Sequence, residues 1–390
     1  MVTTSFSAAQ NLMTPIYRHL HFANLGQVCL FTLYAVICLT SLVSTYVSTK
    51  ISIKTGLLGG ASTYIIFILG GTLATYCHKF EDQTLYVCQT SFIYYYNVFA
   101  AGCLGVGAAF IWLSQGVYVN RCASEKTRGL FNGIFLSIMQ FSQILGSTIA
   151  AADLGYTDEF TFYCILSCFA IIGAMMFVFL PDPAAYQEKE EEPQFMMTLQ
   201  ESLKSFLRTL ISKKYYFLFI AMAFSGLGVA FYATYLSTAV ETTISSLDHH
   251  IIERNISLVF LVLAIAEILA GISIGSLADK TNKVKLMGCT FVIFEGALLF
   301  NFLSLYMGSY NLSIVYGALF GYADTACNTM INVVIGSRFK ASAELFSCYR
   351  FFQAIGCMIA ASAVILVQKE RIVLFSIMAG ECCSCNYFTS

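Results

Sequence analysis

Charged residues are scarce in this chain. Only 11% of its 390 residues are Asp, Glu, Lys or Arg, whereas soluble domains carry about 25%. Proline occurs four times and tryptophan once, while 58% of the residues are hydrophobic and 15% are aromatic. This composition excludes a set of soluble domains. It predicts an all-α protein that crosses a membrane several times, with the lipid bilayer as its surroundings.

The sequence also lacks the marks of several functional classes. No stretch is basic enough for a nucleic-acid footprint. No nucleophile with a nearby base, no phosphate-binding loop and no cluster of metal ligands is recognisable. We therefore expect no nucleic-acid partner, no cofactor, no metal site and no enzymatic activity.

Cysteine is frequent, with 15 residues, but it is not arranged as in a disulfide-rich secreted domain. Most of the cysteines are single and scattered through apolar segments, where they serve as small apolar helix residues. Three of them, Cys382, Cys383 and Cys385, gather near the end of the chain without nearby His. Palmitoylation of a membrane-proximal thiol and an ordinary helix end are both open for this cluster.

Apolar segments long enough to cross a bilayer recur along the chain. A span needs roughly 20 apolar residues. About eleven full spans are expected, near residues 26–48, 56–77, 90–119, 129–152, 160–180, 215–240, 256–276, 286–307, 311–335, 344–367 and 372–388. Residues 1–13 are apolar but too short to span, and no charged region precedes them as it would in a signal peptide.

A hydrophilic stretch divides these spans into five and six. Residues 181–194 hold three of the four prolines and a run of Glu. One additional span at the start would give two halves of six, and residues 1–13 resemble its second half. We therefore expect a first span truncated at the N-terminus. The predicted organisation is an N-terminal half at 1–180, a linker at 181–214 and a C-terminal half at 215–390.

The linker is predicted to be cytoplasmic and to contain a helix. Most of the 21 Lys and Arg fall in one set of alternating loops that includes the linker, and such loops face the cytoplasm. Residues 195–212 place Phe195, Leu199, Leu203, Phe206 and Leu210 on one helical face, which suits either the membrane interface or packing against other segments.

Two Asn-x-Ser sequons, at Asn255 and Asn311, then fall on the opposite side of the membrane, as glycosylation requires. Asn255 is the better candidate acceptor because Asn311 lies close to the bilayer. The expected location is the plasma membrane or an endomembrane.

Two six-span halves joined by a cytoplasmic linker resemble the plan of the major facilitator superfamily, and one loop adds to that resemblance. Residues 275–286, GSLADKTNKVKL, are similar to the superfamily's signature loop. Gly275 allows two helices to approach closely, and Asp279 can cap a helix or pair with a charge. The basic residues Lys280, Lys283 and Lys285 suit the anionic cytoplasmic face. The equivalent first-half loop, 47–56, keeps two Lys but lacks the Asp.

Polar residues inside the spans are candidates for lining a central cavity. A charge at mid-bilayer costs roughly 2.5–3.5 kcal/mol, so it usually faces a cavity or a partner. The candidates that share this position inside a span are Gln140, Gln143, Glu267, Glu295, Asp324, Asn328, Asn332, Arg350 and Gln353. Asp324, Asn328 and Asn332 recur at every fourth residue and so form a stripe.

An alternative for the amides is simple hydrogen bonding between helices, worth roughly 0.6 kcal/mol per contact. An ion pair of Arg350 with Asp324 or with one of the Glu residues is also open.

A further set of residues resembles a particular branch of the superfamily. GAAFIWLSQGVYVN, residues 107–120, places Trp112, Gln115 and Tyr118 on one helical face. The segment resembles a signature of the uncoordinated-93 family, whose members are described as ion-channel regulatory proteins. The segments SFSAAQNL, GIFLSIMQFSQILGS and GYADTACNTMINVVIGSRF are also similar to that family, in the right order. Met330 stands where the family usually has Gln, and Asn120 where it often has Thr.

Three functions are compatible with this resemblance. It implies an accessory protein that binds an ion channel, such as a potassium channel, or another membrane protein. The degenerate first-half loop favours this function. The buried charges and the intact second-half loop favour a secondary transporter of a small solute or ion. A trafficking chaperone for membrane receptors is the third hypothesis.

Overall fold

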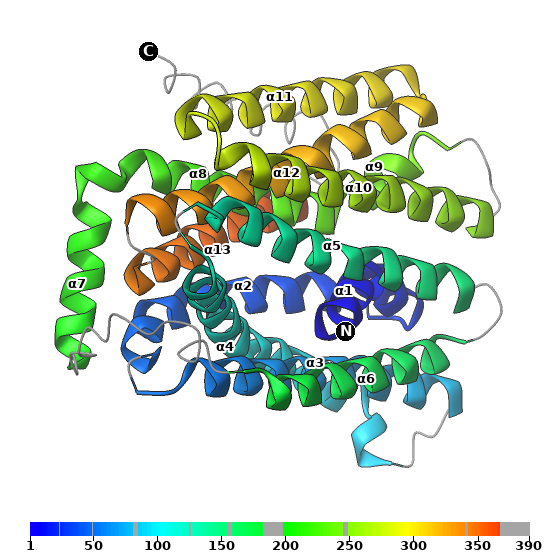
Figure 1. Ribbon diagram of the computed structural model, residues 1–390. Coiled ribbons are helices and arrows are strands. Elements are labelled where there is room, and N and C mark those ends of the chain that lie inside the picture. Colours follow the sequence, from blue (N-terminus) through cyan, green and yellow to red (C-terminus); the bar gives the residue numbers. More distant parts are fainter. Residues whose placement is uncertain are drawn as a thin grey trace. The chain divides into compact units, whose positions relative to one another are not determined.

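A computed structural model describes residues 1–22, 24–48, 50–80, 85–124, 126–153, 158–181, 198–244, 249–339 and 342–366. In these residues every regular element is a helix (Figure 1). The α-helices are α1 (Val2–His19), α2 (Leu25–Ser48), α3 (Ile53–Phe80), α4 (Thr90–Cys122), α5 (Arg128–Asp153), α6 (Glu159–Met176), α7 (Leu199–Ile211), α8 (Tyr216–Phe231), α9 (Ser237–Glu241), α10 (His249–Ala278), α11 (Lys283–Met307), α12 (Tyr310–Arg338) and α13 (Ala343–Leu366).

The predicted all-α membrane fold is confirmed. Within the described ranges, nine helical stretches are long and apolar enough to cross a membrane. Every predicted span coincides with a helix except 372–388, which lies outside the described residues. The span predicted at 215–240 is interrupted, because a π-helix at Tyr232–Leu236 separates α8 from α9. Such a turn bends a helix without proline.

The helices gather into two compact units. The first unit comprises Met1–Cys122, Thr148–Ser212 and Ala343–Ile355. Within it, α3 packs on α4 and α6, α2 packs on α4, and α1 packs on α6. Buried polar bonds tie these helices together: the Tyr17 hydroxyl donates to Asn97 Oδ1 over 2.7 Å, and Ser5 Oγ donates to the Leu166 carbonyl over 2.8 Å.

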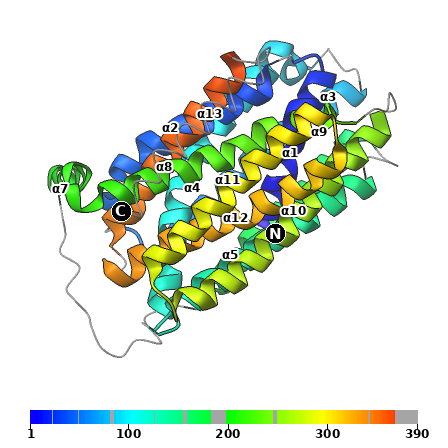
Figure 2. The same ribbon diagram turned by 90° about the horizontal axis from the view of Figure 1, so that it is seen from above.

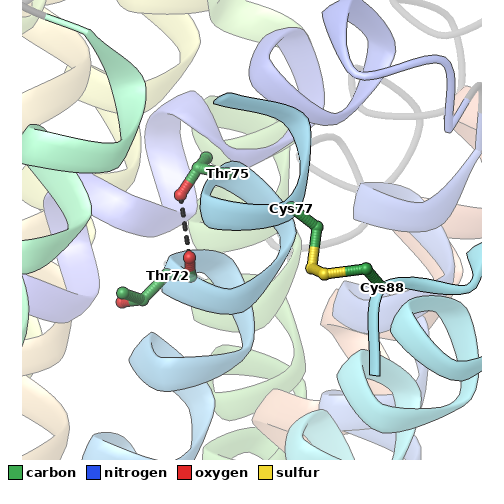
Figure 3. Close-up of a disulfide and its surroundings, with 4 residues drawn as sticks. All are labelled: Thr72, Thr75, Cys77 and Cys88. Atoms are coloured by element: carbon green, nitrogen blue, oxygen red, sulfur yellow. Dashed lines mark hydrogen bonds between the residues drawn. A yellow bond between two sulfur atoms is a disulfide. The ribbon is translucent and has the colours of Figure 1, made fainter. Parts of the chain in front are cut away.

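The first unit also holds a disulfide that was not predicted from the sequence. Cys77, near the end of α3, is bonded to Cys88 in a short 3-10 helix that precedes α4 (Figure 3). In the same unit, Lys79 forms an ion pair with Asp158, and His19 Nδ1 is hydrogen-bonded to Glu159 Oε1 over 2.9 Å.

The second unit comprises Ala123–Ser147, Lys213–Ser342 and Gly356–Ser390, the last of these described up to residue 366. Its helices α10 and α11 both pack along α12, as both views show (Figure 2). Aromatic rings fill the core: Phe294 contacts Phe224 and Phe320. The first part of α5 belongs to this unit and the first part of α13 to the other.

The predicted halves, 1–180 and 215–390, stay a prediction.

The predicted linker helix is present as α7. Thr198 caps it, since the Thr198 hydroxyl accepts from the Glu201 N–H while the Glu201 carboxylate accepts from the Thr198 N–H. The hydrogen bonds that the carboxylate accepts from the Thr198 N–H and, less strongly, from the Thr198 hydroxyl lower the pKa of Glu201 below its usual value. Phe206 is buried and contacts the Phe351 ring, so this face packs on the first unit. Leu207 is exposed on another face, and Phe195 lies outside the described residues.

Candidate functional site

A buried polar network joins three helices of the second unit. Gln140 of α5 donates from Nε2 to Glu267 Oε1 of α10 over 3.0 Å and to Thr325 Oγ1 of α12 over 3.3 Å. Glu267 is 0% exposed and Asp324, which precedes Thr325, is 2% exposed. Helix periodicity explains why the side chains of Gln140, Glu267 and Thr325 lie on the inward faces of their helices. Only the packing of α5 on α10 and α12 brings the three side chains together.

Each of the two carboxyl groups has one buried oxygen that makes no hydrogen bond within the described structure. These oxygens are Glu267 Oε2 and Asp324 Oδ1. A Cβ atom added to Gly228 of α8 would lie 3.3 Å from Asp324 Oδ1 and 3.1 Å from Phe294. The surroundings of Asp324 are therefore tight and partly aromatic. A carboxyl group in such a place is stable only when its charge is removed or compensated.

The amides of the predicted stripe on α12 hydrogen-bond along their own helix. Asn328 donates from its side chain to the Asp324 carbonyl over 2.9 Å, and Asn332 donates to the Asn328 carbonyl over 2.9 Å. Each amide group therefore bonds back to its own helix. The amide oxygen of Asn332 is buried and makes no hydrogen bond in the part of the chain described. Glu295, on α11, is half-buried and also has one such oxygen.

The start of α5 lies close against the end of α10. Gly129 and Gly133 face Gly271 and Gly275, and a Cβ atom on any of these would strike the backbone of the opposite helix. Ser137 Oγ donates to the Ile268 carbonyl over 3.0 Å in the same contact. We call this contact the α5–α10 seam. Small residues make it, so the two backbones approach without interdigitating side chains.

Asp279 closes one end of the seam. Its Oδ1 accepts from the Gly129 N–H and its Oδ2 from the Leu130 N–H, both over 2.9 Å. The carboxylate thus occupies the positive amino end of α5, where free N–H groups and the helix dipole favour an anion. Lys280 and Lys285 are exposed and Lys283 is half-buried, all in or just after the turn between α10 and α11.

Arg350 lies among aromatic rings of the first unit. Its guanidinium group is 4.9 Å from the centre of the Trp112 ring and 4.3 Å from that of Tyr349. It also donates to Gln353 Oε1. The Trp112 indole N–H is also hydrogen-bonded to the Tyr64 hydroxyl. Cation–π contacts of this kind help to hold a desolvated guanidinium group. The ion pair of Arg350 with a carboxylate stays a prediction.

The residues of the signature on α4 contact different partners, and their shared role in lining a cavity stays a prediction. Trp112 contacts Arg350. Tyr118 instead donates from its hydroxyl to the Pro181 carbonyl over 3.1 Å, and Gln115 is buried. On α5, Gln143 is also buried.

The two sequons occupy helices. Asn255 is half-buried within α10, and its carbonyl accepts from the Tyr310 hydroxyl over 2.9 Å. In the other sequon Ser313 is 1% exposed and bonded to Thr243 over 3.2 Å. An accessible hydroxyl is therefore missing at Asn311–Ser313. Glycosylation at Asn255 stays a prediction.

Sequence reasoning missed the Cys77–Cys88 pair and Thr325. A signal for the disulfide was available, because both cysteines flank one short hydrophilic loop between two spans. Thr325 carries no signal of its own, since a Thr in an apolar helix ordinarily bonds to its own backbone.

Comparison with known proteins agrees with this architecture. Residues 1–361 match the Major Facilitator Superfamily. UNC93-like protein MFSD11 of Xenopus laevis is 23% identical over 302 residues, and the match covers 66% of each chain. Protein unc-93 homolog A of Bos taurus is 22% identical over 435 residues, covering 97% of this chain and 88% of the relative. The resemblance to the uncoordinated-93 family is thereby confirmed, at low identity.

A solved structure has the same fold. The crystal structure of a bacterial homologue of the iron transporter ferroportin, in an outward-facing state, superimposes with a TM-score of 0.72 at 12% identity. The superposition covers 99% of this chain and 95% of that one. At this identity the similarity concerns the fold alone.

Proposed function

Because this chain belongs to the Major Facilitator Superfamily, we propose that it is a secondary transporter that moves a small solute or ion across its membrane. The observation that carries the proposal is the buried pair of carboxyl groups, Glu267 and Asp324, inside the membrane-spanning helices α10 and α12. Each would cost roughly 2.5–3.5 kcal/mol as a lone charge at mid-bilayer. Residues this costly are found in ion and solute pathways more often than in simple anchors.

The α5–α10 seam supports the proposal as a contact that can open and close. Backbone contact through Gly133 and Gly271 has no interlocking side chains to disengage. Asp279 adds two charge-assisted hydrogen bonds to the amino end of α5. A transporter needs two arrangements separated by only a few kcal/mol, and a seam of this kind is a suitable element for switching between them.

The proposed orientation places the linker helix α7 in the cytoplasm. The excess of Lys and Arg in the linker and in the loop around Lys280 supports this side. The Cys77–Cys88 disulfide supports it independently, because it lies between α3 and α4, in the opposite set of loops. Disulfides persist in oxidising compartments and are rare on the cytosolic side.

The test is uptake by the purified full chain in proteoliposomes across a panel of small anions, cations and neutral solutes. At least one solute should accumulate, and Glu267→Gln should reduce that uptake at least tenfold. The matched control is Glu241→Gln, an exposed carboxylate at the end of α9 in the same unit, which should leave uptake unchanged. Absence of uptake for every solute would contradict the proposal, and equal uptake by both variants would contradict the role of Glu267 in transport.

A second candidate function is that of an accessory protein bound to an ion channel. The loop between α2 and α3 contains no acidic residue equivalent to Asp279, which favours this alternative. In the first unit, Ser44 and Thr45 of α2 instead bond to Ser347 at the start of α13, over 2.9 and 2.7 Å. The contact at Asp279 is made by a carboxylate, whereas the contact at Ser347 is made by neutral hydroxyl groups. A transporter whose two halves move alike is less well served by two such different contacts.

Affinity purification of tagged chain, followed by current recordings with and without it, separates this alternative from transport. Co-purification of a channel whose current changes, together with no solute uptake, would favour the accessory role. A partner protein that is mislocalised when the chain is absent, with currents and uptake unchanged, would favour a trafficking chaperone instead.

A further inference from the structure

We propose that Glu267 and Asp324 form a proton-binding site, in which the proton is carried on Oε2 of Glu267 and Gln140 holds the carboxyl group in place. The inference deepens the transport function proposed above and rests on it for the role of the proton as a coupling ion. Proton binding itself can be measured without any transported solute, so the two ideas can fail separately.

The surroundings of the pair favour a proton over other cations. Gln140 from α5 bonds to Glu267, the Asn328 side chain is hydrogen-bonded to Asp324, and Gly228 from α8 and Phe294 from α11 lie close to Asp324. None of these residues is charged. The nearby acid on α11, Glu295, is half-buried. In the residues described, no group of three or more His, Cys, Asp or Glu is placed to hold a metal ion.

Two acids with no basic neighbour among the described residues cannot both stay ionised in such a place. The charge of Asp324 acts on Glu267, and both groups are almost fully removed from water. Like charges close together in a low-dielectric interior favour protonation of at least one group. A proton neutralises one acid and needs no further ligands. The tight packing around Gly228 and Phe294 leaves no room for the additional ligands that a metal cation would need.

The hydrogen bond from Gln140 assigns the proton to one oxygen. An amide N–H of Gln140 donates to Glu267 Oε1, so that oxygen is an acceptor and serves as the carbonyl of the acid. Oε2 receives no hydrogen bond within the described structure, and it is the oxygen left to carry the proton. The acid can release that proton when Asp324 or a solute accepts it.

Gln140 is a positioning residue in this arrangement, and it links the acid to the seam. It lies on α5 one turn beyond Ser137, whose hydroxyl bonds to the Ile268 carbonyl beside Glu267. A shift of α5 along α10 would therefore remove the donor from Oε1 when it opens the seam. The free energy of protonating Glu267 would then depend on whether the α5–α10 seam is open or closed.

The test is the infrared spectrum of the purified full chain in lipid membranes at neutral pH. Protonated carboxylic acids have a carbonyl stretching band separate from those of carboxylates and amides. Glu267→Gln should remove one such band, while Glu241→Gln, an exposed carboxylate of the same unit, should leave every band in place. A band that persists in Glu267→Gln, or that is absent from the unaltered chain, would overturn the proposal.

Gln140→Leu provides the second measurement and keeps both acids. Loss of a donor to the carbonyl oxygen should move the Glu267 band to higher frequency without removing it. A merely structural role for Gln140 would lower stability and leave the frequency unchanged. This variant also decides the case if Glu267→Gln fails to fold, because an unshifted band in Gln140→Leu contradicts the assignment of the proton.

Further outcomes separate the proton site from the transport function. Stabilisation of the chain by sodium chloride over choline chloride, together with no acid band, would mean that the site binds a metal cation, and the proposal would fail. A band that Glu267→Gln removes, together with no uptake of any solute, would leave the proton site standing and overturn transport.

Discussion

Buried amide side chains of the second unit fall into two groups with different energetic consequences. Asn332 donates to the Asn328 carbonyl, which as part of α12 already accepts a backbone hydrogen bond. The amide oxygen of Asn332 makes no hydrogen bond in the described structure. Gln140 bridges two other helices and satisfies one oxygen of a buried acid. The cost of removing an amide depends on what it leaves unsatisfied, not on its polarity.

A matched pair of substitutions tests this difference. Gln140→Leu should lower the free energy of unfolding by about 1–3 kcal/mol, because Glu267 Oε1 loses its donor in a buried place. Asn332→Leu should be neutral or stabilising, since it removes an unsatisfied buried oxygen and keeps the branched shape and the number of heavy atoms of the side chain. Thermal unfolding of both variants in detergent measures the difference. Equal losses would show that the hydrogen bonds do not decide stability here.

At the scale of the element, the packing of α5 on α10 depends on four glycines whose Cβ positions are occupied by the other helix. Small residues at helix interfaces in membranes allow backbone contact and the dispersion gains that follow from it. Gly296 on α11 differs, because a Cβ there would meet nothing within 4 Å. The sequence contains both kinds of glycine, and only the packing distinguishes them.

Gly133→Leu should therefore separate α5 from α10, whereas Gly296→Leu should not. We expect Gly133→Leu to lower the free energy of unfolding by about 1–3 kcal/mol, the usual cost of overpacking. It should also raise the maleimide reactivity of a cysteine placed at Ser137, inside the seam. Gly296→Leu is the matched control, with the same added volume in the same unit. If both variants behave alike, the seam is not the constraint.

At the scale of the whole molecule, the fold was predictable and the contacts were not. Long apolar segments fix the helices because only helices satisfy their own backbone in lipid. The motif around Trp112 indicated the family, and Glu267 and Asp324 were recognisable as costly residues inside spans. Their joining through Gln140 depends on how α5 meets α10 and α12. Helical periodicity fixes which face a residue occupies, but not the helix that the face meets.

The disulfide makes the orientation of the whole chain testable. In intact cells, Cys77 and Cys88 should resist a membrane-impermeant maleimide until an impermeant reductant is added outside, and then react. A cysteine placed at exposed Gln200 of α7 should react only after permeabilisation, because the linker is proposed to be cytoplasmic. Cys77→Ser with Cys88→Ser controls for labelling of other thiols. Labelling at Gln200→Cys in intact cells would contradict the proposed orientation. The disulfide is expected on the opposite side from Gln200, because disulfides persist in lumenal or external loops.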